Sequence, residues 1–270
     1  NGTVSVSSGS LTVVERLTNP SRIEVQESGV LTLADGISGR IGGTVYVHGG
    51  VLTHSDNVSF NNLERWYKVD SDTTLSDFIV ANGLNKDDNL NFYLTNGADF
   101  TLDVMYEGTS YSYEVNSGTN LIVATASVVG SLDLSGGTIT VNSGTGLEIT
   151  GKTSSSGGGS MLANAAVVYR QSGVVFGGTY NSDLSLLGES MSINTDLTVA
   201  GVLTAKSTTG RVAVTISRDA KLTILGTVAD AYTTTYQVYG NMNIATEAAK
   251  VAFSGAIYIR TYGQLNAAAD

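Results

Sequence analysis

The sequence has no cysteine and only one proline, Pro20, among its 270 residues. Without cysteine, disulfides and thiol chemistry are excluded. Proline cannot donate a backbone hydrogen bond to a strand ladder, so its near absence suits a chain built from stacked strands. Amphipathic helical periodicity is nearly absent too, since only residues 74–82 and 247–251 fit a short helical turn.

Charged residues are also scarce, at 14% of the chain against about a quarter in typical soluble domains. The net charge is −10, which argues against a nucleic-acid partner and, more weakly, against anionic membranes. No apolar run approaches the roughly 18–20 residues needed to span a bilayer, so no membrane span is expected. The chain starts at Asn1 without a methionine or a signal peptide, and we interpret it as a mature or excised fragment.

What the sequence does contain is a short recurring pattern: a small residue, a variable one, an apolar one, a polar one, then an apolar or small one. Near the C-terminal end its apolar third positions fall at steps of 19, 20 and 23 residues, at Leu203, Leu222, Met242 and Leu265. Near the start they fall at steps of 20 and 21, at Leu11, Leu31 and Leu52. A period near 20 residues that tolerates small insertions is typical of a solenoid.

Each copy of the pattern alternates apolar and polar residues, which predicts a strand with one face buried. The glycine before many copies predicts a tight corner. A second alternating run, such as Val212-Ala213-Val214, precedes many copies. The sequence therefore predicts an all-β, right-handed parallel β-helix with about 20 residues per coil, whose inward leucines, valines and isoleucines stack on one another.

Residues 61–123 interrupt this pattern. Ten of the twenty aromatic residues lie between Phe60 and Tyr113, and ten of the twenty-four acidic residues lie between Glu64 and Glu114. Alternating runs are joined there by the turn signals 96–97 (Asn-Gly) and 107–108 (Glu-Gly), which predict antiparallel hairpins. The predicted organisation is β-helix coils over 1–60, an inserted hairpin region over 61–123, and coils again over 124–270.

Side chains that could perform chemistry do not form a recognisable motif. His48 and His54 lack the neighbouring ligands of a metal site, and we expect them to be structural. Asp70, Asp72 and Asp77 are similar to oxygen-rich calcium ligation, but the glycine and the terminal glutamate of an EF-hand loop are missing. A carbohydrate-active β-helix would require acidic residues at the same position of successive coils, and the acidic residues of these coils do not recur in this way. No catalytic, cofactor-binding or metal-binding residue is therefore proposed.

Aromatic residues of the insertion are the candidates for contact with a ligand or partner, because aromatic faces stack on ligands at low entropic cost. An alternative stays open, in which many of them form the small core of the inserted region. The candidate contact residues are Trp66, Tyr67, Tyr93, Tyr106, Tyr111 and Tyr113.

Three segments resemble the repeat of bacterial autotransporter passengers and related surface adhesins, which runs Ser/Gly-Gly-x-apolar-x-apolar-x-x-Gly. They are 27–33 (ESGVLTL), 47–53 (VHGGVLT) and 135–144 (SGGTITVNSG). The resemblance extends over about 3–60 and 130–267. It implies a right-handed β-helix on the bacterial cell surface, attached to the outer membrane in the full-length protein, with a role in adhesion, self-association or biofilm formation.

The first functional hypothesis is thus a non-enzymatic, extracellular structural protein or adhesin that mediates attachment or self-association. Its partner would be another copy, a host or bacterial surface protein, or a glycan. One alternative is a self-assembling extracellular filament or surface-layer subunit. Another is a phage tail spike or polysaccharide-degrading β-helix, which predicts a cluster of acidic residues along the coils.

Overall fold

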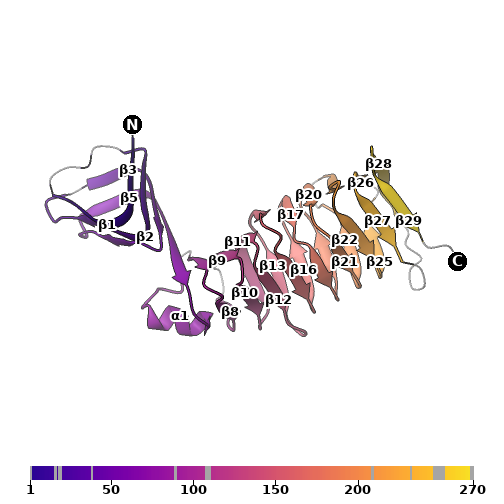
Figure 1. Ribbon diagram of the computed structural model, residues 1–270, viewed down its shortest axis with the longest axis horizontal. Coiled ribbons are helices and arrows are strands. Elements are labelled where there is room, and N and C mark those ends of the chain that lie inside the picture. The colour runs from indigo at the N-terminus through magenta and orange to yellow at the C-terminus, as the bar shows by residue number, and fades with distance from the viewer. Residues whose placement is uncertain are drawn as a thin grey trace. The chain divides into compact units, whose positions relative to one another are not determined.

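The computed structural model describes residues 2–14, 17, 20–37, 39–87, 90–106, 111–207, 210–231, 233–245 and 253–267. Strands make up 60% of an all-β structure, whose parallel sheets repeat about 20 residues apart in a β-solenoid of about 12 turns. This confirms the predicted parallel solenoid; its handedness stays a prediction. The chain divides into two compact units (Figure 1). The first unit is Asn1–Lys68 with Leu90–Tyr93, and the second unit is Val69–Asn89 with Leu94–Asp270.

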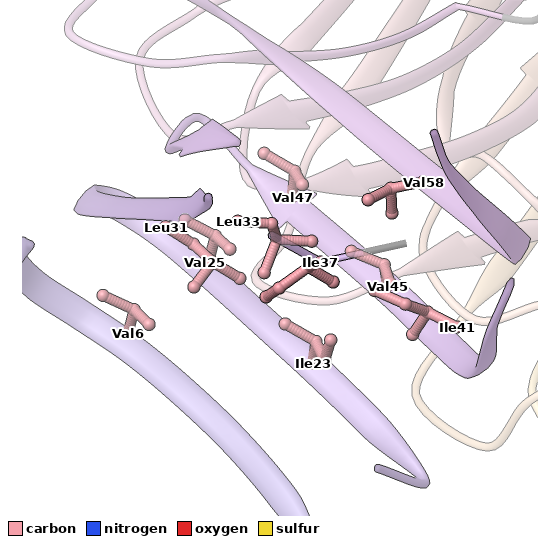
Figure 2. Close-up of a cluster of buried hydrophobic side chains, with 10 residues drawn as sticks. All are labelled: Val6, Ile23, Val25, Leu31, Leu33, Ile37, Ile41, Val45, Val47 and Val58. Carbon is pink, nitrogen blue, oxygen red and sulfur yellow. The ribbon is translucent and has the colours of Figure 1, made fainter. Parts of the chain in front are cut away.

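The first unit is a stack of four strands of 10–12 residues and two short ones. They are β1 (Thr3–Val13), β2 (Arg22–Leu33), β3 (Gly39–His48), β4 (Val51–Thr53), β5 (Val58–Val69) and β7 (Asn91–Leu94). Leu31 of β2 pairs with Leu11 of β1 and with Leu52 of β4, so the repeat phase predicted for this end is confirmed. Figure 2 shows the core of the unit, in which ten buried apolar side chains gather. They are Val6, Ile23, Val25, Leu31, Leu33, Ile37, Ile41, Val45, Val47 and Val58.

The second unit is a column of coils with three parallel sheets on its sides (Figure 1). The first sheet of this unit contains β9 (Tyr111–Asn116), β11 (Ser127–Ser135), β13 (Gly146–Ile149), β14 (Thr153–Ser155), β16 (Ala166–Tyr169), β19 (Leu184–Leu186), β22 (Val202–Ala205) and β25 (Thr227–Asp230). The second sheet contains β6 (Thr73–Thr74), β8 (Asp99–Leu102), β10 (Asn120–Val123), β12 (Thr138–Val141), β15 (Ser160–Ala163), β18 (Gly178–Tyr180), β21 (Leu197–Val199), β24 (Lys221–Ile224), β27 (Asn241–Ile244) and β29 (Gln264–Ala267). The third sheet contains β17 (Gly173–Val175), β20 (Ser190–Ile193), β23 (Val212–Ile216), β26 (Thr234–Val238) and β28 (Ala256–Ile259).

The repeat phase near the C-terminal end is confirmed for three of its four copies. Met242 pairs with Leu222 on one side and with Leu265 on the other, all in the second sheet. The fourth copy was assigned wrongly, because Leu203 lies in the first sheet and pairs with Leu184 and Val228. Strands of different sheets share the same alternation and the same small corner residue, so the local pattern does not tell them apart.

The predicted antiparallel hairpins within 61–123 are wrong. Asn96 and Gly97 do form the expected turn, with φ of 56° and 77° and a hydrogen bond of 3.2 Å from the Ala98 N–H to the Thr95 carbonyl. The turn nevertheless joins β7 to β8, which belong to different sheets, while β8 pairs with β10 and β9 pairs with β11 in parallel. A parallel partner one coil away satisfies each strand, so the turn becomes a corner of the solenoid. The predicted turn at 107–108 lies outside the described residues.

A short helix, α1 (Leu75–Ala81), occupies the predicted position 74–82. Thr74 caps its N-terminus, since the hydroxyl accepts a hydrogen bond of 3.1 Å from the Asp77 N–H. Leu75 and Ile79 are buried one turn apart, which fixes the helix on the unit. The second predicted helical turn, 247–251, lies outside the described residues.

A loop of hydrogen bonds lies inside the second unit. The Tyr180 hydroxyl donates to the Phe176 carbonyl over 2.9 Å, and the Phe176 N–H donates to the Tyr169 hydroxyl over 3.1 Å. The two hydroxyls are 2.9 Å apart, so Tyr169 donates to Tyr180 and closes the loop. Burial raises the pKa of both phenols and keeps them neutral. Two buried tyrosines therefore fit the interior without an unsatisfied hydroxyl.

Candidate functional site

The six aromatic residues predicted to contact a ligand are divided between the units. Trp66, Tyr67 and Tyr93 belong to the first unit, and Tyr106, Tyr111 and Tyr113 belong to the second. The exposed fraction is only 3% for Tyr93, 4% for Tyr111 and 2% for Tyr113. Burial of these three favours the alternative interpretation, in which they pack. The contact role stays a prediction for the half-buried Trp66, Tyr67 and Tyr106.

In the first unit, rings gather around His48. Its ring stacks on that of Tyr93 with centroids 3.9 Å apart, and lies 6.2 Å from Trp66 and 5.9 Å from Tyr46. The indole N–H of Trp66 donates to a Glu64 carboxylate oxygen over 2.9 Å. The ring contacts give His48 a packing role on a half-buried surface.

In the second unit, Tyr106 lies beside an apolar groove of about 250 Å³ over the outward faces of β11, β13 and β16. Met105, Val128 and Val168 are among its apolar lining residues. Met105 is 45% exposed and Val128 is 37% exposed, so the groove is open to solvent. The groove presents apolar surface that a partner could cover, although nothing in its lining selects one partner.

Carboxylates of the second unit bind the backbone of neighbouring coils. Each accepts a hydrogen bond of 2.7–2.9 Å from the N–H group of a residue 19–27 positions further along. The acceptors are Asp72, Asp183, Asp196 and Asp230, and the donors are Asp99, Val202, Lys221 and Ser254. Such bonds satisfy backbone donors at coil corners, so these acidic side chains hold the solenoid together. Within the described ranges, histidine and acidic side chains do not gather in threes as a metal site would require.

Asp103 uses its carboxylate in the same way, on α1. It accepts a hydrogen bond of 3.1 Å from the Ser76 N–H and a second from the Ser76 hydroxyl. Partial burial raises the pKa of this carboxyl. The hydrogen bonds from Ser76 lower the pKa by more than burial raises it, so the pKa lies below the ordinary 3.8.

The contribution of Asp103 to stability is therefore present at neutral pH and is lost as the pH falls through the lowered pKa. We expect wild type to lose more stability than Asp103→Asn between pH 7 and pH 3, by under about 1 kcal/mol because the group is largely exposed. Urea denaturation at both pH values measures this difference. Equal losses in the two proteins would show that the pair with Ser76 contributes nothing.

A polar groove of about 500 Å³ runs over the corners that follow β13, β16 and β19. Lys152, Arg170 and Glu189 are its charged lining residues. Arg170 is held by Glu148 through two hydrogen bonds of 2.9 and 3.0 Å. Glycoside hydrolysis usually needs two carboxyl groups, and among the described lining residues Glu189 alone carries one.

Sequence analysis missed a row of uncharged side chains on the outward face of the second sheet, six of whose ten members are threonine. Neighbours in the row pair in register from β6 to β29, and none is charged. The signal was the recurrent polar fourth position of the repeat, where threonine predominates. The row, here called the threonine row, is Thr74, Thr101, Ile122, Thr140, Leu162, Thr179, Thr198, Thr223, Asn243 and Asn266.

Sequence analysis also missed an exposed group of tyrosines and arginines, because they are spread over 45 residues of the sequence. They lie on or beside the successive corners that lead from the third sheet to the second, after β23, β26 and β28. The Arg218 guanidinium lies 4.3 Å from the Tyr262 ring centroid, and that of Arg260 lies 5.2 Å from the Tyr258 ring centroid. The group, here called the tyrosine–arginine corner, is Arg218, Tyr239, Tyr258, Arg260 and Tyr262.

No protein-family model matches the chain, and no curated protein or solved structure matches it either. No helix in the described part of the chain has the length and apolar character needed to cross a membrane.

Proposed function

We propose that the protein is a non-enzymatic structural protein or adhesin of the bacterial cell surface, and that it acts by self-association outside the cell. The threonine row is the observation that carries this proposal. Its ten positions follow one another from coil to coil, so at a strand spacing of about 4.8 Å the row is about 43 Å long.

The chemistry of the row suits contact with a copy of itself. The threonine hydroxyls and the asparagine amides that make up eight of its ten positions both donate and accept hydrogen bonds, so two such rows are complementary without any charge. The absence of charge among the row's own residues means that two rows in contact do not repel each other through like charges. Threonine is branched at Cβ and loses little side-chain freedom when it is covered. The resemblance to surface adhesin repeats points to the same use.

Clustering of beads coated with the protein tests the proposal. Thr179→Asp together with Thr198→Asp places two adjacent carboxylates in the row, and we expect clustering to be lost. The matched control, Ser185→Asp together with Thr204→Asp, places two paired carboxylates on the outward face of the first sheet, and should cluster as wild type does. Wild-type beads that stay dispersed at every coating density would refute self-association. Clustering by the threonine-row variant would show that this face is not the contact.

A further inference from the structure

Charge is distributed unevenly along the column of the second unit. Residues 69–123 contain nine acidic residues and one lysine, a net charge of −8. Residues 200–267 contain six lysines and arginines and three acidic residues, a net charge of +3. The column therefore has an acidic end and a basic end, although the whole chain carries −10.

The acidic end presents its carboxylates to solvent. They are linked through two backbone contacts, because Asp72 accepts from the Asp99 N–H and Asp103 accepts from Ser76 in α1. These contacts bring α1, β8 and the segment before β6 together into one surface. The exposed carboxylates, here called the acidic surface, are Asp70, Asp72, Asp77, Asp99 and Asp103.

The basic end carries the tyrosine–arginine corner. Tyr262 is 70% exposed, Tyr258 is 49% exposed and Tyr239 is 38% exposed, which is unusual for large rings. Stacking of Arg218 and Arg260 on two of these rings limits their motion and keeps the positive charge at the surface. Tyrosine and arginine are the residue types that contribute most to the binding energy of protein interfaces.

Both surfaces adjoin the same face of the column. The corner connects β23, β26 and β28 to strands β24, β27 and β29 of the second sheet, where the threonine row ends. The acidic surface surrounds β6 and β8, where the same row begins. One face thus has carboxylates at one end, uncharged side chains (mostly threonine) along its length, and guanidinium groups at the other end.

We propose that two copies pair antiparallel through this face, so that the tyrosine–arginine corner of each docks on the acidic surface of the other. The inference rests on the proposed self-association. A parallel pair would place guanidinium against guanidinium and carboxylate against carboxylate, which repel. The antiparallel pair forms both attractive contacts by a single two-fold rotation, so the assembly closes as a dimer. Charge complementarity also directs the encounter, so association weakens as salt rises.

Sedimentation velocity at low and high salt tests this proposal through charge reversal. The corner variant carries Arg218→Glu and Arg260→Glu. The acidic-surface variant carries Asp70→Lys and Asp99→Lys, which lie at or just before the starts of β6 and β8, as the corner lies at the starts of β24, β27 and β29. Each variant alone should dimerise at least about tenfold more weakly than wild type, because its copies repel one another. An equimolar mixture of the two should restore the dimer, since each reversed surface then meets its opposite. Lys152→Glu with Lys206→Glu, which lowers the net charge by four as the corner variant does but at other positions, should dimerise as wild type does.

The outcomes separate the two proposals. A wild type that is monomeric at every concentration and salt level overturns both. A wild type that associates, with a corner variant that associates equally well, overturns the antiparallel dimer and leaves self-association standing. Failure of the mixture to restore the dimer also overturns the antiparallel dimer. If the corner variant loses binding to dextran sulfate but keeps wild-type self-association, the corner is a site for anionic glycans and the dimer proposal is wrong.

Discussion

Replacement of Leu222 by aspartate is expected to unfold the coils around β24 and to lower the free energy of unfolding by at least about 4 kcal/mol. The Leu222 side chain is 0% exposed and lies in register between Leu197 and Met242. The variant loses the apolar contacts of leucine and places a carboxylate where no positive group is in register with it. Because each coil is supported by its neighbours, the damage should extend to adjacent coils.

The neighbouring position supplies a matched control. Thr223 lies on the same strand but faces outward, so Thr223→Asp adds the same charge and should change stability by less than about 1 kcal/mol. Leu222→Ala should fall between the two, at about 2–5 kcal/mol, because it removes packing without adding a charge. Urea denaturation followed by far-ultraviolet circular dichroism gives the three values. Equal midpoints for Leu222→Asp and Thr223→Asp would refute the inward assignment.

Gly178→Ala is expected to destabilise the second unit by about 3 kcal/mol or more. Gly178 begins β18 with a φ of 123°, a conformation that residues with a side chain rarely adopt. A Cβ there would also lie 2.1 Å from the Met161 carbonyl oxygen and 2.8 Å from its nitrogen, in the coil below. Neither backbone atom can move without disturbing the pairing of β15 with β18.

Gly210→Ala is the control for this variant. A Cβ at Gly210 meets no atom within 4 Å, and its φ is not in the left-handed region. The substitution should change stability by less than about 1 kcal/mol and in the stabilising direction, since alanine restricts the unfolded chain. Thermal denaturation of both variants measures the contrast. A Gly178→Ala protein that melts with wild type would show that the corner tolerates a side chain.

The repeat could be predicted from the sequence because side chains alternate between the buried and the exposed face along a strand, so apolar and polar residues alternate too. Leu222, Met242 and Leu265 were aligned correctly on that basis. Which sheet a strand joins depends on the length of the corners on either side, and that information is absent from a five-residue pattern. Leu203 was misplaced for this reason. The same limit explains the hairpin error, since an Asn-Gly turn fixes a change of direction but not the partner of the next strand.

The candidate site was harder to predict than the fold. Clustering of aromatic residues in the sequence drew attention to Tyr93, Tyr111 and Tyr113, which the structure buries. The tyrosine–arginine corner is the opposite case, because Arg218 and Tyr262 come together from corners two coils apart. Contact between residues of successive coils becomes visible only when the register is known. Surfaces of a solenoid are therefore predictable along one strand, but not across several.

The parallel pairing of the second unit has a mechanical consequence. Its strands bond to partners about 20 residues away in the chain, so the bonds between coils point along the stacking direction. Tension along that direction breaks the hydrogen bonds of one coil at a time, whereas tension along the strands would shear many of these bonds together. Each coil that opens releases about 20 residues, which extend to about 70 Å. A pulled column would lengthen in steps and dissipate work at each one, as an extensible tether does.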